Sequence, residues 1–441
     1  MSAPRITTLG LAAILFGLLS ASLAAATHDH PRQRLVSAQP SAGDRFGHAV
    51  ALGSAWLAVS APYADWGGSA DANFGRVENF VPGEASWEQT FDWDCNDFLY
   101  SANDCYGQQT RYGISLSLDE AEDGSFLLAI GRKRAYTGLF GTLKAFVEVY
   151  FFDGSDWTWN PVEISEDSSA KIDEAFGEST AVSTSGLSPT AFAGERRRPG
   201  VTIASIDFGS DTSSVDFTIE GEPANLGRAV AVSGNRAAIG ASGAVYLLTR
   251  SAESPAFALL ATITGPDGSS GFGRSLALRG TDLVVGAPNS TVADLSDAGR
   301  AYLYDFSSPD DPVHVFEAAE PVMRERLGWA VGLGNDFVAV SAPGGDGTFE
   351  IGMTDGRVFV FDLDSGNPQI ELTLETPDDS DYFGASIAVY ASSVVVGAPY
   401  EDGEAGAAYV FTPLPEPGAL LASLTGLATL ALRARSRSRR S

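Results

Sequence analysis

One short pattern recurs seven times along the chain, and a recurring unit of this kind restricts the fold to architectures built from repeated copies. Each copy opens with an aromatic residue or Leu followed by Gly. These anchor pairs begin at Phe46, Tyr112, Phe176, Leu226, Phe272, Leu327 and Phe383. In five copies a second signature begins 14 residues after the first residue of the pair, as in Gly286-Ala287-Pro288. Equal spacings of this kind indicate one structural unit repeated seven times.

Each unit contains the pattern of four antiparallel strands. After Gly273 the residues alternate in size, and Leu283 to Val285 form a continuous apolar run, typical of a strand covered on both faces. Short turns are expected between these two strands, at Gly53-Ser54, Gly234-Asn235, Gly280-Thr281 and Gly334-Asn335. A third and a fourth strand follow in each copy. The pattern therefore predicts an all-β chain, folded over residues 33–412 as a seven-bladed β-propeller with four antiparallel strands per blade.

The two ends of the repeat region predict how the ring closes. The seventh copy stops after its third strand, at residues 407–411, and a strand-like segment at 33–39 precedes the first anchor pair. We expect this N-terminal strand to complete the last blade, because closure removes exposed sheet edges.

The aromatic-Gly pair followed by Gly-Ala-Pro resembles the FG-GAP repeat of the integrin α-subunit head, a seven-bladed propeller. The resemblance covers about residues 33–412 and implies that one face of the ring binds a partner. Some blades of that family carry an Asp-x-Asp-x-Asp-Gly calcium loop between the first two strands. Here five copies have only tight turns at that place. Calcium therefore stays a weak candidate only in the longer second copy, at Asp119, Glu122 and Asp123, where a solvated acidic turn is the alternative.

Antiparallel geometry sorts the loops onto two faces. Loops between strands two and three share a face with loops that lead from strand four into the next blade, and the tight turns lie on the opposite face. The loops of the first face are long and rich in acidic residues, and one of them contains Trp66. We therefore expect them to bind an extracellular ligand. The alternative is that these polar loops are only solvated. The candidate ligand-binding residues are Asp65, Trp66, Asp71, Asn73, Asp294, Asp297, Asp346, Asp355, Glu401, Asp402 and Glu404.

Both termini predict export. Residues 1–26 contain Arg5, an apolar run and three alanines before the expected cut, as in a secretory signal peptide. Residues 415–441 contain Pro415, Glu416 and Pro417, then an apolar stretch and a basic cluster. This order resembles the PEP-CTERM sorting tail of Gram-negative bacteria. The resemblance implies processing by a membrane exosortase and delivery to the cell surface, outer membrane or extracellular matrix, with membrane contact through this short transmembrane tail alone. An ordinary tail anchor is the alternative.

Composition narrows the partners further. A formal net charge of −28 repels nucleic acid and anionic lipid. Export allows a disulfide between Cys95 and Cys105, and a metal pair is the less favoured alternative.

Signatures of enzymes are scarce. The chain has 4 His and contains no zinc-protease, nucleophile-elbow or phosphate-loop motif. We therefore expect a non-catalytic binding or adhesion module whose partner is an extracellular polysaccharide or surface protein. A secreted polysaccharide-acting enzyme on the same scaffold, or a structural matrix component without a discrete ligand, are the alternatives.

Overall fold

The computed structural model describes fifteen segments of the 441-residue chain. They are residues 27–29, 31, 33–65, 75–83, 86–94, 111–136, 143–154, 162–165, 176–195, 200–206, 213–217, 223–266, 269–344, 356–374 and 381–412. The predicted signal peptide, the sorting tail with Pro415, Glu416 and Pro417, and both cysteines lie outside these residues. Among the described residues, none of the helices has the length and apolar character needed to cross a bilayer.

The strands form seven sheets, one for each copy of the repeat. Blades 1 to 3 comprise β3 (Val50–Leu52), β4 (Leu57–Ala61), β5 (Arg76–Pro82) and β6 (Trp87–Asp94); β7 (Tyr112–Glu120), β8 (Phe126–Tyr136), β9 (Leu143–Phe152) and β10 (Val162–Ser165); and β11 (Phe176–Ser183), β12 (Thr190–Glu195), β13 (Gly200–Ser205) and β14 (Ser213–Phe217). Blades 4 and 5 comprise β15 (Ala229–Ser233), β16 (Arg236–Ala241), β17 (Ala244–Thr249) and β18 (Ala258–Thr264), then β19 (Ser275–Arg279), β20 (Asp282–Ala287), β21 (Arg300–Asp305) and β22 (His314–Phe316). Blades 6 and 7 comprise β23 (Val331–Leu333), β24 (Phe337–Ala342), β25 (Arg357–Asp362) and β26 (Pro368–Leu372), then β27 (Ser386–Tyr390), β28 (Ser393–Ala398) and β29 (Ala407–Phe411).

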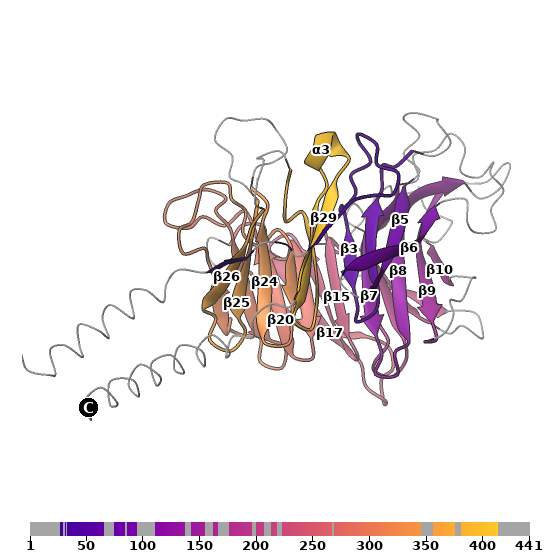
Figure 1. Cartoon of the computed structure of the whole chain (residues 1–441). Helices are drawn as coiled ribbons and strands as arrows, with labels where there is room; N and C mark the ends of the chain where they lie inside the picture. The colour runs from indigo at the N-terminus through magenta and orange to yellow at the C-terminus, as the bar shows by residue number, and fades with distance from the viewer. Residues whose placement is uncertain are drawn as a thin grey trace, which may run out of the picture.

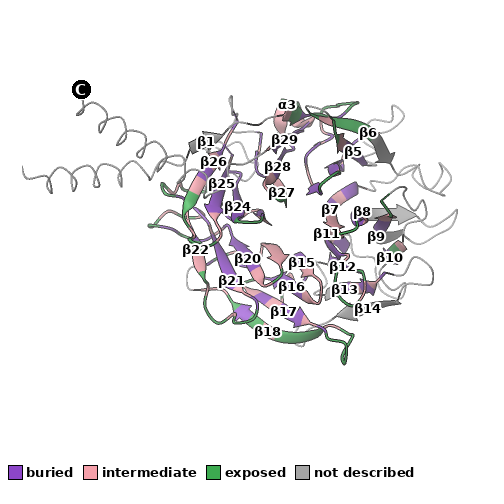
Figure 2. Cartoon of the chain, turned by 60° about the horizontal axis from the view of Figure 1, so that its bottom comes forward, coloured by how far each residue is buried: buried purple, intermediate pink, exposed green. Residues whose placement is uncertain are grey.

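The blades close into a ring. Within each sheet the strands follow one another in chain order, with the first strand innermost, and neighbouring strands of a repeat pair antiparallel. Figure 2 shows the blades arranged in a ring. The innermost strands contact one another around this ring, and β27 of blade 7 contacts β3 of blade 1. The prediction of an all-β, seven-bladed propeller is confirmed.

The N-terminal segment completes the last blade, as predicted. Strand β2 (Gln33–Leu35) pairs antiparallel with β29, with Gln33 opposite Val410 and Leu35 opposite Ala408. It is shorter than the 33–39 segment proposed from the sequence. A further strand, β1 (Thr27–Asp29), was not predicted and adds parallel to β26 at the edge of blade 6. The N-terminal residues thus tie blades 6 and 7 together.

The two repeat signatures meet at the boundary between blades. A Cβ atom on Gly286 of blade 5 would lie 2.1 Å from the carbonyl oxygen of Gly328, the anchor glycine of blade 6. The same relation holds for Gly240 and Gly273, where the distance would be 2.2 Å. At these boundaries the two strands can approach this closely because neither of the two facing residues has a side chain, which explains why glycine recurs at both positions in most copies.

The tight turns differ from prediction in register at two places. Strands β15 and β16 are joined by Gly234-Asn235 and β19 and β20 by Gly280-Thr281, as expected, since Ser233 pairs with Arg236 and Arg279 with Asp282. Gly53 and Gly334 are not turn residues, because each still pairs with the opposite strand of its hairpin. Gly53 donates its N–H to Trp56 O at 2.8 Å and Gly334 donates to Phe337 O at 2.9 Å. The turns therefore lie one residue later, because the apolar strand residues decide the register.

Candidate functional site

The long loops and the tight turns lie on opposite faces of the ring, as predicted. Figure 1 shows the short helix α3 (Glu401–Glu404), in the loop between β28 and β29, at the end opposite the hairpin turns. Parallel bridges join the loop between strands two and three of one blade to the loop entering the next, as between Gly75 and Tyr112 or Gly299 and Leu327. We call the side that carries these loops the decorated face.

The acidic candidates of blade 7 bind arginines of this same chain. Arg34 contacts Glu401 at 2.7 Å and Asp402 at 2.5 Å, and Arg45 contacts Glu404 at 2.8 Å. Tyr409 also donates its hydroxyl to a Glu401 oxygen at 2.6 Å. These three carboxylates therefore hold the loop of blade 7 against the N-terminal segment and the entry to blade 1.

The other acidic candidates are dispersed. Asp294 and Asp297 both lie in the loop between β20 and β21 with left-handed φ angles of 67° and 54°. The Asp297 carboxylate accepts a hydrogen bond from Asn289 Nδ2 at 3.1 Å. Asp65 lies in the loop that follows β4. Trp66, Asp71, Asn73, Asp346 and Asp355 lie outside the described residues. Within the described segments, no three His, Cys, Asp or Glu residues gather as metal ligands.

The weak calcium candidate of blade 2 lies on the tight-turn face, at the hairpin formed by the end of β7 and the turn into β8. Asp119 accepts hydrogen bonds from Thr184 N at 2.6 Å and from its hydroxyl at 2.8 Å. Asp123 accepts from Ser125 N and Oγ, and these bonds lower the pKa of Asp123. Glu122 is exposed. Protein groups therefore already occupy carboxylate oxygens of Asp119 and Asp123, and calcium binding there stays a prediction.

A cluster that the sequence analysis missed crosses the decorated face. Arginine and aromatic side chains from blades 2, 1, 7, 6 and 5 contact one another in a continuous series, which we call the arginine–aromatic arc. Its members are Arg111, Tyr63, Arg45, Tyr400, Tyr382, Trp329, Arg326 and Arg274.

The first half of the arc spans the closure of the ring. The Arg45 guanidinium lies over the Tyr63 ring at 4.5 Å and over the Tyr400 ring at 4.6 Å, distances measured to the ring centroids. Arg111 lies over the same Tyr63 ring at 4.9 Å. Two tyrosines of different blades therefore hold Arg45 between them.

The second half continues through blades 7, 6 and 5. Tyr400 packs edge-on against Tyr382, with ring centroids 5.6 Å apart, and Tyr382 packs edge-on against Trp329 at 5.8 Å. Arg274 lies 3.7 Å from the centroid of the Trp329 ring and Arg326 lies 5.7 Å from it. Burial raises the pKa of Tyr382, and the neighbouring Arg326 and Arg274 oppose the rise.

Every member of the arc occupies a position next to a repeat signature. Arg45, Arg111, Arg326 and Tyr382 immediately precede an anchor pair, Arg274 and Trp329 immediately follow one, and Tyr63 and Tyr400 follow an Ala-Pro signature. Arg274 and Trp329 lie close to the starts of the innermost strands β19 and β23. The sequence could have revealed this cluster, because Arg, Tyr or Trp recurs directly beside the signatures of several copies.

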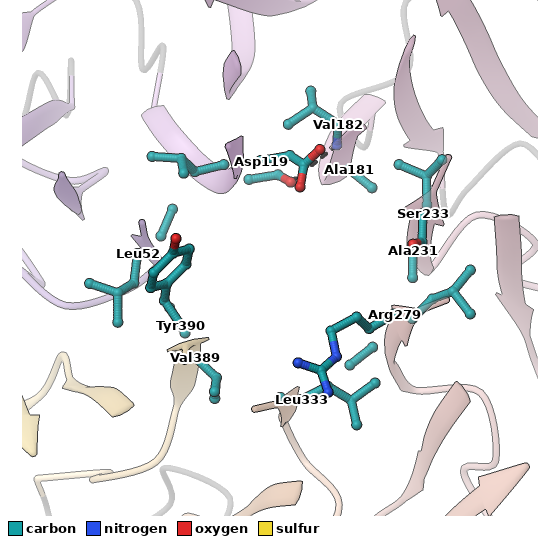
Figure 3. Close-up of a pocket in the computed structure, with 18 of the residues that line it drawn as sticks. Leu52, Asp119, Ala181, Val182, Ala231, Ser233, Arg279, Leu333, Val389 and Tyr390 are labelled. Carbon is teal, nitrogen blue, oxygen red and sulfur yellow. Dashed lines mark hydrogen bonds between the residues drawn. The ribbon is translucent and has the colours of Figure 1, made fainter. Parts of the chain in front are cut away.

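A cavity of about 580 Å³ lies in the central channel, lined by residues of all seven innermost strands (Figure 3). Apolar side chains such as Leu52, Val182 and Val389 form its wall. At the tight-turn end the lining includes Asp119, Glu120, Arg279 and Tyr390, and Figure 3 shows Asp119 and Arg279 on different sides of the space. Arg279 donates to Asn335 Oδ1 at 2.8 Å, and Ser54 N donates to Glu120 at 2.7 Å. The polar side chains at the tight-turn end of the cavity thus link neighbouring blades.

Comparison with known proteins agrees with the repeat structure. The family model of the FG-GAP repeat matches residues 257–304 and 369–411. Each match begins at strand four of one blade, β18 or β26, and ends within strand three of the next, β21 or β29. The sequence unit is therefore offset from the blade and spans the boundary at which the two signatures meet. No curated protein sequence matches the chain.

Two solved structures resemble this chain in the arrangement of the backbone. Saccharomyces cerevisiae Sqt1 is 12% identical with a TM-score of 0.48, covering 86% of this chain and 98% of that one. The periplasmic gluconolactonase PpgL of Pseudomonas aeruginosa is 13% identical with a TM-score of 0.42, covering 75% and 86%. The spacing of the signatures, the seven sheets and the matched residues lead to one conclusion: this chain carries FG-GAP repeats arranged as a seven-bladed β-propeller.

Proposed function

We propose that this protein is an exported, non-catalytic binding module that contacts an extracellular ligand through its decorated face. The observation that carries the proposal is the arginine–aromatic arc, which is assembled from five blades on that face. Tyr, Trp and Arg are the residues that contribute most often to binding energy at protein surfaces. Their concentration at one end of a rigid ring supports a recognition surface.

The arc is also built to keep its shape. Its side chains are partly buried and stack on one another, so little conformational freedom remains for binding to remove. Scaffold elements set each position, because every member lies beside an anchor pair or an Ala-Pro signature. A preorganised site on rigid elements favours binding over loose solvation of the loops.

Export through residues 1–26 and sorting through residues 415–441 complete the proposal. The Pro415-Glu416-Pro417 motif, the apolar stretch and the basic end support processing by an exosortase-type enzyme and display at the surface or in the extracellular matrix of a Gram-negative bacterium. The propeller would then face the polysaccharides and surface proteins outside the cell, which are the proposed partners.

The experiment is an array of polysaccharides and surface glycoproteins probed with residues 27–412. These residues contain every described strand and close the ring by themselves. We expect selective binding to a small set of ligands, both with calcium and with EDTA. Absence of binding to every ligand would contradict the proposal, and release of shortened products from a bound polysaccharide would overturn its non-catalytic part.

A further inference from the structure

We propose that two copies of this chain associate through the outer edge of blade 4, with β18 of one copy pairing antiparallel to β18 of the other. The proposal goes beyond recognition by the decorated face, because it concerns a different surface and a different partner. Three observations carry it: exposed apolar residues at the perimeter of blades 4 and 5, the absence of charge on β18, and the residue that occupies the bulge of this strand.

Exposed apolar side chains gather at the perimeter of blades 4 and 5. Four of them form what we call the perimeter patch: Leu259 (49% exposed), Leu260 (52%), Val313 (54%) and Val315 (48%). Figure 2 shows β18 as an exposed strand at the outer margin of the ring. Val315 lies opposite Tyr302, and Ala261 packs against the buried cluster that contains Tyr302. Both outer strands therefore border the same core, and exposed apolar patches of this kind mark interaction surfaces.

Among the described strands, β18 is the one outermost strand that is long, uncovered and uncharged. Its sequence is ALLATIT, seven residues without an ionisable side chain. The outermost strands of blades 1, 2, 3 and 7 contain charged residues, as at Glu163 of β10, Asp216 of β14 and Arg34 of β2. In blade 5 β22 has only three residues, and in blade 6 β1 covers β26. Charges, short strands and covering strands prevent edge pairing, so β18 lacks the protection that the other edges have.

The bulge in β18 carries an apolar residue that the fold does not require. Leu260 is the extra residue between two paired positions. Blades 1 and 6 have a bulge at the equivalent place in strand four, where the extra residue is Thr90 or Gln369. A polar residue therefore suits this position, and a partner would remove the leucine of blade 4 from water. Beyond the bulge, Ala261 to Thr264 pair with β17 and leave their other edge free for a further strand.

The charge of the chain favours a second copy as the occupant of this edge. A formal net charge of −28 makes two copies repel each other, and β18 lets them approach without an ionisable residue on the pairing strand. A basic partner would instead be attracted to the acidic surface of the protein. Two identical antiparallel strands are related by a two-fold axis, so each copy meets the surface that it presents. Because the perimeter patch is small, we expect a weak dimer that depends on concentration.

The direction of β18 decides how such a dimer would present its two rings. Strand four of each blade leads into the next blade on the decorated face, and antiparallel pairing reverses this direction in the second copy. The two decorated faces then point in opposite directions. On the binding function proposed above, the dimer would join two separate ligands, whereas a parallel arrangement would place both faces on one surface.

Sedimentation velocity of residues 27–412, at increasing protein concentration and without ligand, tests the dimer. The apolar tail is left out so that it cannot cause association itself. The test variant is Leu260→Lys combined with Val315→Lys. The matched control is Val36→Lys combined with Met323→Lys, which adds the same two charges at residues that are 40% and 52% exposed outside the perimeter patch. Hydrogen–deuterium exchange at low and high concentration locates the contact, and circular dichroism checks the folding of each variant.

We expect a monomer–dimer equilibrium in the micromolar range for the unmodified protein and for the control. The dimer of the test variant should be about tenfold weaker or more, although its lysines reduce the net charge and hence the general repulsion. Backbone amides of β18 should exchange more slowly at high concentration. Leu260→Gln, which copies the residue of blade 6, should also weaken the dimer and serves if the double variant does not fold.

Three results would overturn the proposal: a protein that stays monomeric, a dimer that forms equally well in the test variant, or concentration-dependent protection confined to another strand. Because these measurements contain no ligand, their failure leaves the proposed binding function standing. Failure of the ligand array likewise leaves the dimer standing.

Discussion

Ser275 of blade 5 donates a hydrogen bond through its hydroxyl group to the carbonyl oxygen of Gly328 in blade 6, at 2.9 Å. The bond crosses the blade boundary beside the close approach of Gly286 to Gly328. Three other boundaries repeat it, from Ser115 to Gly177, Ser179 to Gly227 and Ser386 to Gly47, at 2.7, 2.7 and 2.9 Å.

Two blades use a different arrangement. Ala49 and Ala330 stand where four other copies have Ser, and in these two copies the second signature begins with Ser60 or Ser341 in place of Gly. Copy 4 has Ala229 at this position and keeps Gly240, so it has neither serine. The Ser60 hydroxyl accepts from Ala49 N at 3.0 Å, and Ser341 accepts from Ala330 N at 2.8 Å. One serine hydroxyl is therefore present in each of these six blades. The first strand of the blade supplies it in four of them, and the second strand supplies it in the other two.

Ser275→Ala should lower the free energy of unfolding by about 1 kcal/mol, because the carbonyl oxygen of Gly328 loses the hydrogen bond that it accepts from Ser275. Urea unfolding followed by tryptophan fluorescence would measure the change. Ser308→Ala, at an exposed turn position, is the control and should change stability by less than half as much. Equal effects of the two substitutions would show that the hydroxyl of Ser275 contributes nothing particular.

Gly286→Ala should destabilise the protein by about 3 kcal/mol, because its Cβ would lie 2.1 Å from Gly328 O and force blades 5 and 6 apart. Gly243→Ala separates this clash from backbone strain. Gly243 has a φ of 79°, and a Cβ added there would meet no atom within 4 Å, so only about 1 kcal/mol is expected. A loss at Gly286 no larger than that at Gly243 would contradict close packing of the blades as the reason for the signature.

Removal of residues 27–35 should lower the unfolding temperature more than removal of residues 27–30. The longer deletion takes away β2, exposes the edge of β29 and uncovers the buried Leu35 site, whereas the shorter one removes only β1 from blade 6. Differential scanning fluorimetry would rank the two, with the complete 27–412 chain as reference. Limited proteolysis should then cut blade 7 first in the longer deletion. Equal melting of both deletions would rule out β2 as the closing strand.

Tyr304→Phe should make the protein more resistant to alkaline unfolding. Burial raises the pKa of Tyr304 from its ordinary value near 10 to about 12. The unfolded chain therefore releases this proton first, and the stability that the neutral phenol contributes below pH 10 is lost as the pH rises toward 12. Phe cannot ionise, so the decline between pH 10 and 12 should be shallower in the variant. Urea midpoints at pH 8, 10 and 11 would test this, and parallel declines in both proteins would contradict it.

The sequence by itself determined the class of fold, the number of blades and the way the ring closes. These follow from local regularities: alternating strand residues, the spacing between the two glycine signatures, and a missing fourth strand after Phe411 with a substitute at Gln33. Register at Gly53 and Gly334 was not determined in this way, because packing of the strand residues moved the turns by one position.

The tertiary structure alone decided which side chains meet. Arg45 and Tyr400 are far apart in the chain and contact only because the ring brings blade 7 beside blade 1. The acidic residues Glu401, Asp402 and Glu404 were predicted to bind a ligand because they lie in a long loop of the decorated face, whereas in the fold they bind Arg34 and Arg45. A repeat pattern specifies the scaffold because the contacts that it determines are those between neighbouring strands. A binding surface depends on contacts between distant copies, and the variable positions beside each signature acquire partners only when the ring closes.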